Sequence, residues 1–204
     1  MNEQLLKMNG LSLKILEELS YESHLGISLK KNLHYFDKAS LMLELAMATE
    51  WYDEQELLSD IALDYRIKSL DSIILKYDRY YPDHQTRKVF NDILGFRAFC
   101  DSYSQVLEFQ SEQFRIADMS KGKTLDDGYR GVHVYYQKSS KHYPIEIQFN
   151  TLFDRQLNNW LHEYLYKREY PEKTGAIIRE KYENGLIRSE NEFEEALRDV
   201  LFNS

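Results

Sequence analysis

The sequence is poor in the residues that would point away from an ordinary globular protein. A single cysteine, Cys100, excludes an internal disulfide framework and a cysteine-based zinc site, and it favours a reducing compartment. Three prolines and eight glycines in 204 residues exclude a linker-rich, collagen-like or disordered chain. Because 43% of the residues are hydrophobic and 29% are charged, we expect one domain with a sizeable core.

Long hydrophobic runs are also missing. The longest, residues 41–48, is interrupted by Glu44 and is far too short to span a bilayer. The first twenty residues mix glutamate and lysine with leucine, so they lack the apolar core of a secretion signal. We therefore expect a soluble, cytoplasmic protein that does not interact with a membrane.

The chain has no excess of positive charge. Its 26 basic and 34 acidic residues leave a net charge of −8, which argues against a protein that coats long nucleic acid through a broad basic surface. Residues 61–100 differ from the rest, with seven basic and five acidic residues. A local basic block in an acidic protein is typical of a small polyanion site, such as one for nucleotide phosphates, although chance variation over 40 residues gives similar counts.

Hydrophobic periodicity predicts an α/β (α+β) fold, in which a mixed sheet of about five strands is flanked by helices. The expected strands are 65–68, 93–100, 114–118, 131–136 and 143–149, the last two forming a hairpin. The expected helices are 2–22, 38–50, 53–63, 69–80 with Ser69 as N-cap, 102–113, 152–169, 173–184 and 190–202. We expect a single domain over 1–204, with a helical N-terminal region (1–60), a core (61–167) and C-terminal helices (168–204).

Alternation along residues 143–149 places Glu146 and Gln148 together on one face of a strand, opposite the apolar side chains. A buried carboxylate is unfavourable unless a polar group faces it, so this face is either solvated or part of a site. Asp92 precedes the buried strand 93–100 and could share a cation with Glu146 if the two strands are neighbours. Two carboxylates together with phosphate oxygens and water are the usual ligands of Mg²⁺ beside a nucleotide.

Basic side chains lie on both sides of Asp92 along the chain. Ser72 and Lys76 lie four residues apart on one expected helix, whose N-terminus favours anions. Arginine and lysine are both common in polyphosphate sites, and the candidates are Arg66, Lys68, Lys76 and Arg97. A solvated, charged helix face is the alternative interpretation.

Four motifs occur in the order that characterises one protein family. They are Arg66-Ile-Lys68-Ser-Leu-Asp-Ser72-Ile-Ile-Leu-Lys76, Asp92-Ile-Leu-Gly95-Phe-Arg97, Gly128-Tyr129-Arg130-Gly131-Val-His133 and Ile145-Glu146-Ile-Gln148. Over about residues 60–167, roughly half of the chain, the sequence resembles the RelA/SpoT synthetase domain, the pyrophosphokinase module of alarmone synthetases. The chain is similar to a small, single-domain member with a nucleotidyltransferase-like synthetase fold.

This resemblance implies that the β,γ-pyrophosphate of ATP is transferred to a ribose 3′-hydroxyl and that AMP leaves, with Mg²⁺ as cofactor. It implies that the ATP phosphates are bound by Arg66, Lys68, Lys76 and Arg97, with Ser72 assisting. Asp92 and Glu146 would hold Mg²⁺, and Glu146 would also accept the proton of the attacking hydroxyl. Tyr129 would stack on the acceptor base, while Gln148 and His133 would orient the acceptor or its phosphates.

Two departures from the family pattern concern the acceptor. Members that use GTP or GDP usually have Lys-Pro-x-x-Gly-Tyr before the stacking tyrosine, whereas Leu125 and Asp127 stand here where lysine and asparagine are common. They also usually have an arginine two residues after the glutamine, where this chain has Asn150. Both changes remove positive charge, and we expect them to weaken binding of the 5′-phosphates of free GTP or GDP.

Residues 150–162 resemble the toxin branch of the small alarmone synthetases. In that branch some members pyrophosphorylate the 3′ end of tRNA and others make adenosine alarmones, and a terminal tRNA adenosine carries no 5′-polyphosphate. The prediction is therefore a translation-inhibiting toxin that acts on the tRNA 3′ CCA end and is neutralised by a protein antitoxin. Lys30 and Lys31 either contact the tRNA acceptor stem or form a solvated helix end.

Two alternatives stay open. One is a small alarmone synthetase that makes (p)ppGpp from GTP or GDP, or an adenosine alarmone. The other is a nucleotide-binding or RNA-binding module without catalysis, which would not need the carboxylates Asp92 and Glu146. Replacement of Glu146 by glutamine separates an enzyme from such a module.

Overall fold

The computed structural model describes residues 3–109, 111–166 and 170–202, and these divide into two compact units. The first unit comprises Met1–Ala98, Glu108–Ile116 and His133–Gln148, and the second comprises Phe99–Leu107, Ala117–Val132 and Phe149–Ser204. The single domain over 1–204, with boundaries near residues 60 and 167, stays a prediction. Within the described ranges, no helix is both long and apolar enough to cross a membrane.

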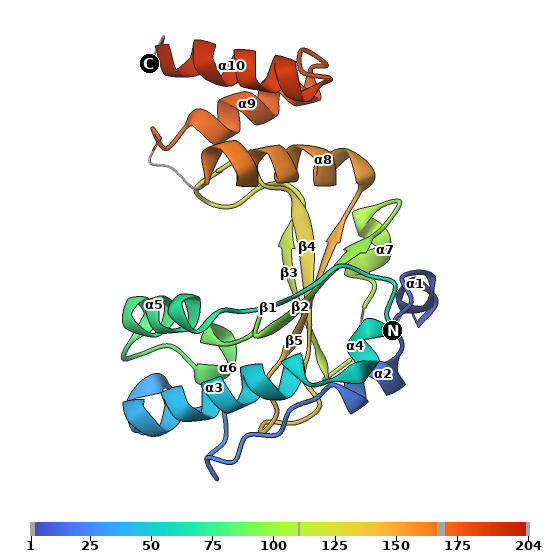
Figure 1. Cartoon of the computed structure of the whole chain (residues 1–204). Helices are drawn as coiled ribbons and strands as arrows, with labels where there is room; N and C mark the ends of the chain where they lie inside the picture. The colour runs from blue at the N-terminus through green and yellow to red at the C-terminus, as the bar shows by residue number, and fades with distance from the viewer. Residues whose placement is uncertain (1–2, 110, 167–169, 203–204) are drawn as a thin grey trace. The chain divides into compact units, whose positions relative to one another are not determined.

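Five strands form a mixed sheet in the order β1-β2-β5-β4-β3 (Figure 1). The strands are β1 (Tyr65–Ile67), β2 (Leu94–Phe99), β3 (Phe114–Met119), β4 (Gly131–Tyr136) and β5 (Ile145–Asn150). β1 pairs antiparallel with β2, and β4 and β5 are neighbours, as the predicted hairpin requires. The predicted fold class, about five strands flanked by helices, is confirmed.

One face of the sheet is apolar and fully buried. On β5 the side chains of Ile145, Ile147 and Phe149 are inaccessible to solvent, as the alternation predicted. The inward residues of β2 and β4 continue this layer: Leu94, Phe96, Ala98, Val132, Val134 and Tyr136. Burial of this face holds the strands together and leaves their alternate side chains on the opposite face.

Six α-helices and a 3₁₀ turn lie in the part of the first unit that the structure describes. They are α1 (Glu3–Met8), α2 (Leu13–Glu18), the turn η1 (Leu33–Tyr35), α3 (Lys38–Asp53), α4 (Glu56–Ser59), α5 (Leu70–Tyr80) and α6 (Thr86–Val89). The α5 prediction is confirmed, since the Ser69 hydroxyl accepts a hydrogen bond from the Ser72 amide at the N-cap. The short α6 was missed because four residues show no helical periodicity.

Two helix predictions for this unit were wrong in extent. The helix expected over 2–22 is divided into α1 and α2 because Gly10 adopts φ +73°, a left-handed conformation that ends a helix. Ser12 then caps α2 through the Ile15 amide. The helix expected over 53–63 is limited to α4: α3 ends at Asp53, the first residue of that range, Glu54 is its C-cap, and α4 ends at Ser59.

The described part of the second unit contains α7 (Tyr103–Leu107), α8 (Leu152–Trp160), the π-helical turn η2 (Leu161–Leu165), α9 (Thr174–Glu183) and α10 (Glu190–Phe202). In Figure 1, α9 lies between α8 and α10, and the three share one apolar cluster that includes Leu157, Ile178 and Phe193. The predictions for α9 and α10 are confirmed. α8 and η2 cover most of the helix expected over 152–169, of which residues 167–169 lie outside the described chain.

The helix expected over 102–113 ends early, at Leu107. The chain then turns so that Phe109 is buried against Phe114, with their ring centroids 5.5 Å apart. Packing of these aromatic rings in the core overrides the weak helical pattern of residues 108–113.

Candidate active site

The polar face of the sheet collects charged side chains from all five strands. Arg66 on β1 lies opposite Gly95 on β2, and a Cβ atom placed on Gly95 would be 3.3 Å from Oε2 of Glu146 on β5. On β4, the His133 ring lies 3.0 Å from Glu146 through Nδ1. Arg115 on β3 stacks over the ring of β4 Tyr135, and these contacts place all of the side chains on one face.

Asp92 is the centre of a cluster of cations. Its carboxylate, in a residue only 7% exposed, accepts hydrogen bonds from Lys68 at 2.6 Å and from Lys76 at 2.9 Å. Arg66 approaches the same carboxylate at 3.8 Å. Burial lowers the pKa of Lys68, and the Asp92 charge opposes that effect. The structure thus brings three of the residues predicted to bind the ATP phosphates together around Asp92, a predicted magnesium ligand.

Arg97 and Ser72 complete the predicted ATP-binding set. Arg97 is two residues after Gly95 on β2, so its exposed side chain lies on the polar face. Ser72 is partly buried in the first turn of α5, beside Ser69. α5 positions its residues well for an anion, because its free amide groups and its dipole both favour negative charge at the N-terminus.

Glu146 is held in place by three side chains. It is 4% exposed, and its oxygens accept hydrogen bonds from His133, from the Gln148 amide at 2.6 Å and from the Tyr135 hydroxyl. Burial alone would raise the pKa of this carboxyl, but the bonds to the ionised form outweigh it and lower the pKa to about 2. Glu146 is therefore ionised at neutral pH and fixed in orientation.

The carboxylates of Asp92 and Glu146 are the candidate magnesium ligands. Hard carboxylate oxygens are the donors that Mg²⁺ prefers, and two of them are enough when phosphates and water complete the coordination shell. Among the residues that the structure describes, no group of three or more His, Cys, Asp or Glu side chains is arranged around a common metal position. Two carboxylates would suit a cation that also takes phosphate oxygens and water as ligands.

Tyr129 lies on a loop of the second unit that is held from three sides. Arg130 forms a bidentate ion pair with Asp126, at 2.7 and 2.9 Å. Arg179 on α9, only 1% exposed, donates to the Gly128 carbonyl and to the Asp154 carboxylate of α8. This buried network orders the loop that carries the predicted stacking tyrosine.

Two of the three positions that depart from the family pattern, Asn150 and Asp127, have structural partners in this unit, whereas Leu125 is exposed. Asn150, 3% exposed, donates to the Arg130 carbonyl and accepts from Arg155. Asp127 accepts from the Lys123 ammonium at 2.5 Å and from the Tyr129 amide at 3.1 Å. The nearby cations Lys123, Arg130 and Arg179 are thus each paired with a carboxylate.

Lys30 and Lys31 are exposed and lie in the first unit. The Lys31 carbonyl accepts hydrogen bonds from the amide and the hydroxyl of Thr86, at the start of α6. The Lys31 ammonium lies 5.1 Å from the centre of the Tyr35 ring. These two lysines are part of an ordered segment that pairs with α6 rather than the end of a helix.

Three residues of the polar face were absent from the predicted site: Arg87, Arg115 and Tyr135. Arg115 and Tyr135 have a signal in the sequence, because they occupy the polar phase of two alternating strands. The sequence carries no such signal for Arg87, because this residue lies on the short helix α6.

The chain matches one described family, the "Region found in RelA / SpoT proteins", over residues 65–170, just over half of its length. Among solved structures it is similar to small alarmone synthetase 1 of Bacillus subtilis bound to its product pppGpp, with 22% identity over 79% of this chain and 89% of that one, at a TM-score of 0.45. Small alarmone synthetase 2 of the same organism also has 22% identity, over 74% and 92% of the two chains, at a TM-score of 0.44. No curated protein matches the chain.

Proposed function

This chain belongs to the RelA/SpoT family and is a pyrophosphokinase, and we propose that it transfers the β,γ-pyrophosphate of ATP to the 3′-hydroxyl of the tRNA CCA end. In this reaction the ribose 3′-oxygen bonds to the β-phosphorus, the bond from that phosphorus to the α,β-bridging oxygen breaks, and AMP leaves. The observation that carries the proposal is the polar face itself, where a cation cluster lies on one side of a fixed, ionised Glu146.

Arg66, Lys68, Lys76 and Arg97 bind the ATP phosphates in this proposal, with Ser72 at the N-terminus of α5. Lys68 and Lys76 already form ion pairs with the Asp92 carboxylate. Their ammonium groups are therefore already positioned when the ATP phosphates bind. Mg²⁺, when bound, would be held by Asp92 and Glu146 and would neutralise charge on the phosphate oxygens. Positioning and charge neutralisation are the main sources of catalysis in phosphoryl-type transfer.

Glu146 accepts the proton of the attacking hydroxyl. A carboxylate with a pKa of about 2 is a weak base, but in a loose transition state the nucleophile needs little deprotonation before the bond forms. Glu146 contributes to the reaction because it is charged and correctly oriented. The Nδ1–H of His133 and the Gln148 amide hold it in that state through hydrogen bonds. Tyr129 stacks on the acceptor base from its own ordered loop.

The preference for tRNA over GTP or GDP rests on the cations near Tyr129. Lys123 and Arg130 are paired with Asp127 and Asp126, and Asn150 is buried in hydrogen bonds to the backbone and to Arg155. The loop therefore offers little positive charge to a free 5′-polyphosphate, whereas the terminal adenosine of tRNA carries a single phosphodiester. A toxin with this activity acts in the cytoplasm and requires a protein antitoxin.

The experiment uses purified protein with ATP labelled at the γ-phosphate, which travels with the transferred pyrophosphate. Deacylated tRNA, GTP, GDP and AMP are offered separately. We expect label on tRNA, and we expect that label to be lost when the 3′-terminal adenosine is removed beforehand. Label on a guanosine nucleotide and none on tRNA would identify an alarmone synthetase instead.

Glu146→Gln tests catalysis directly. The amide cannot accept a proton or hold a cation as the carboxylate does, so we expect turnover to fall by about 1,000-fold or more while ATP binding persists. Glu18→Gln, an exposed change at the end of α2, serves as the matched control and should keep full activity. Biological activity that survives Glu146→Gln would point to a binding module.

A further inference from the structure

The loop that carries Tyr129 holds a lysine over the ring of this tyrosine. The Lys123 ammonium lies 5.1 Å from the centre of the Tyr129 ring and 2.5 Å from the Asp127 carboxylate. The other oxygen of the same carboxylate accepts a hydrogen bond from the Tyr129 amide at 3.1 Å. One carboxylate therefore fixes both partners of a cation–π contact, the lysine through its charge and the tyrosine through its backbone.

A tight turn determines where the chain places Lys123. The Gly122 amide donates to the Met119 carbonyl at 3.0 Å, and the φ of Gly122 is +97°, a left-handed conformation that favours glycine. A Cβ atom at Gly122 would lie 2.8 Å from the Arg130 guanidinium, so the turn packs directly on the ion pair between Arg130 and Asp126. Lys123 therefore follows an ordered turn, although 41% of its side chain is exposed.

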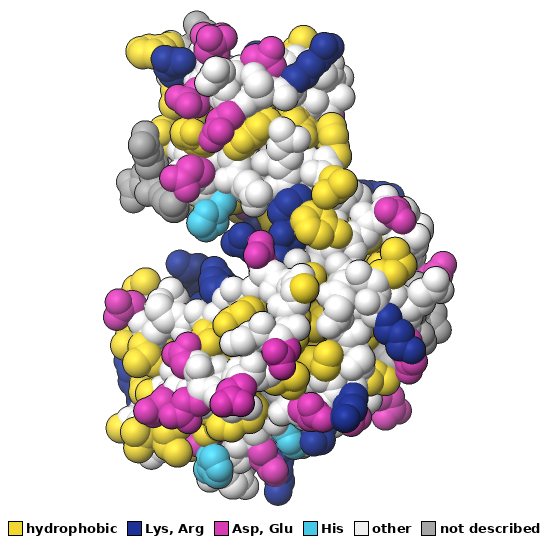
Figure 2. All heavy atoms as spheres, turned by 45° about the vertical axis from the view of Figure 1, so that its right-hand side comes forward, with side chains coloured by type: hydrophobic (Ala, Val, Ile, Leu, Met, Phe, Trp, Pro, Cys, Tyr) yellow, Lys and Arg dark blue, Asp and Glu magenta, His cyan; other side chains and the backbone are white. Residues whose placement is uncertain are grey.

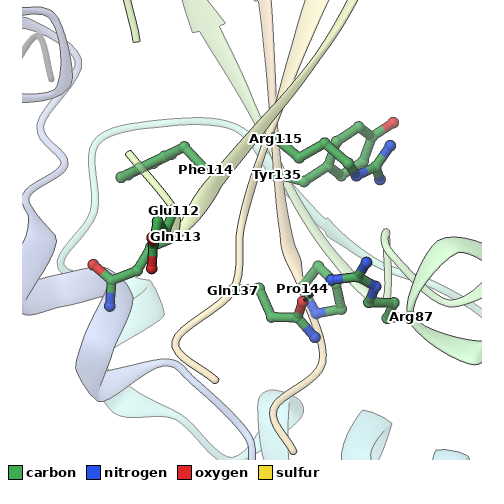
Figure 3. A pocket seen from close by; sticks show the side chains of 8 residues that line it. All are labelled: Arg87, Glu112, Gln113, Phe114, Arg115, Tyr135, Gln137 and Pro144. Carbon is green, nitrogen blue, oxygen red and sulfur yellow. Dashed lines mark hydrogen bonds between the residues drawn. The ribbon is translucent and has the colours of Figure 1, made fainter. Parts of the chain in front are cut away.

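The first unit contains a comparable contact next to the proposed base. The Arg115 side chain lies alongside the Tyr135 ring, with its guanidinium 4.2 Å from the ring centre (Figure 3). The hydroxyl of this tyrosine hydrogen-bonds to Glu146, which requires the ring to keep one orientation. In each unit, a cation thus covers an aromatic ring whose orientation matters in the proposed function.

The contacts of Lys123 favour support of the ring over binding of a phosphate. Its charge is already matched by Asp127, so its attraction for a further anion is reduced. A cation over the face of a tyrosine is attracted to the negative π-surface and limits rotation of the side chain. An acceptor base that stacks on the opposite face meets a ring that is already oriented, so less conformational entropy is lost when the acceptor binds.

We propose that Lys123 is a positioning residue for the acceptor: anchored by Asp127, its ammonium covers one face of the Tyr129 ring, and the acceptor base stacks on the opposite face. Tyr129 consequently stacks a single base, the one whose ribose carries the reacting 3′-hydroxyl. This inference rests on one part of the proposed function, the stacking of the acceptor base on Tyr129. It applies equally to the terminal adenosine of tRNA and to a free nucleotide.

The test measures kcat and the KM for deacylated tRNA and for ATP in Lys123→Met, Lys123→Arg and Asp127→Asn. Methionine keeps the length of the lysine stem but has no charge, so we expect the KM for tRNA to rise about fivefold, with kcat and the KM for ATP nearly unchanged. Asp127→Asn removes the anchor and should raise the same KM by a similar factor. Arginine keeps both the charge and the ring contact, so Lys123→Arg should have a KM close to that of the wild type.

Two further variants control for the loss of charge and for independent effects. Lys121→Met removes an exposed positive charge from the same loop, two residues away, and should leave all of these values unchanged. The Lys123→Met/Asp127→Asn double variant should be no worse than either single variant, because both changes remove the same contact. Thermal unfolding midpoints should stay near that of the wild type, since the Lys123 side chain is largely outside the core.

The sign of the Asp127→Asn effect separates positioning from phosphate binding. If Lys123 binds a phosphate of the acceptor, Asp127→Asn frees the lysine and lowers the KM, and Lys123→Met reduces the slope of log(kcat/KM) against log[salt] by about one. Either result overturns the inference, as does an unchanged KM in Lys123→Met. If wild-type protein labels only GTP or GDP, the proposed action on tRNA fails, and the same variants then test this inference with that nucleotide as acceptor.

Discussion

At the scale of single residues, the site depends on the close contact between Gly95 on β2 and the Glu146 side chain on β5. Gly95 lies on the polar face of β2, and its missing side chain leaves room for the Glu146 carboxylate. Any larger residue there would press on a group that His133, Gln148 and Tyr135 hold from other directions. In the proposed function, the glycine is therefore part of the catalytic geometry, although it contributes no polar atom.

Gly95→Ala tests this packing. The new Cβ would lie 3.3 Å from Oε2 of Glu146, a tight contact that must move the carboxylate by a few tenths of an ångström. We expect turnover to fall about tenfold or more, because small misplacements of reacting groups are costly. ATP binding and the thermal unfolding midpoint should change little. Turnover at the wild-type level would mean that Glu146 tolerates displacement.

At the scale of elements, the C-terminal helices order the Tyr129 loop of the same unit. Arg179 on α9 is fully buried and joins the Gly128 carbonyl to Asp154 and Asn158 on α8. Tyr166 also donates to the Asp127 carbonyl at 3.1 Å. Residues after 170, which lie outside the family match, thus support a loop that lies within it.

Gly175→Ala should disturb that loop. A Cβ on Gly175 would lie only 2.0 Å from the Asp127 carbonyl oxygen, which is backbone and cannot rotate away. We expect the KM for the acceptor to rise at least tenfold and stability to fall by about 1–3 kcal/mol, with the KM for ATP unchanged. Gly185→Ala is the control, because its surroundings are open and only its φ of +73° costs about 1 kcal/mol. Equal effects of the two changes on acceptor KM would rule out a specific role for the contact.

At the scale of the whole molecule, the net charge of −8 constrains how a polyanion such as tRNA can bind. Figure 2 shows acidic and basic side chains interspersed over one face of the molecule. General electrostatic attraction to RNA is therefore weak, and affinity must come from a few local contacts. The cations predicted from the sequence to contact the RNA are Lys30 and Lys31.

This count predicts the salt dependence of tRNA modification. Two phosphate contacts should give a slope of log(kcat/KM) against log[salt] of about −1.5 to −2, which is roughly a tenfold loss between about 50 and 200 mM salt. Initial rates at subsaturating tRNA measure this slope, and the Lys30→Gln/Lys31→Gln protein should lose most of it. A much steeper slope would reveal a larger basic surface than the one proposed.

Local features of this protein were predictable because they depend on neighbours in the sequence. Period-two alternation along β5 predicted that Glu146 and Gln148 share a polar face opposite Ile145 and Ile147, and the structure confirms it. The N-cap Ser69 and the start of α5 follow from local hydrogen bonding in the same way. The order of four short motifs along the sequence also indicated the family, and the family match over residues 65–170 confirms that prediction.

Contacts between distant segments could be decided only by the tertiary structure. Three such contacts are the pairing of the Lys31 segment with α6, the stacking of Arg115 on Tyr135, and the close approach of Gly175 to Asp127. In each case, the local sequence pattern around one residue does not indicate which residue it contacts. The early end of α7 and the division of the first helix show the same limit at the level of elements. Periodicity reports which face of an element is buried, whereas the identity of the residues that meet across that face is set by how the whole chain packs.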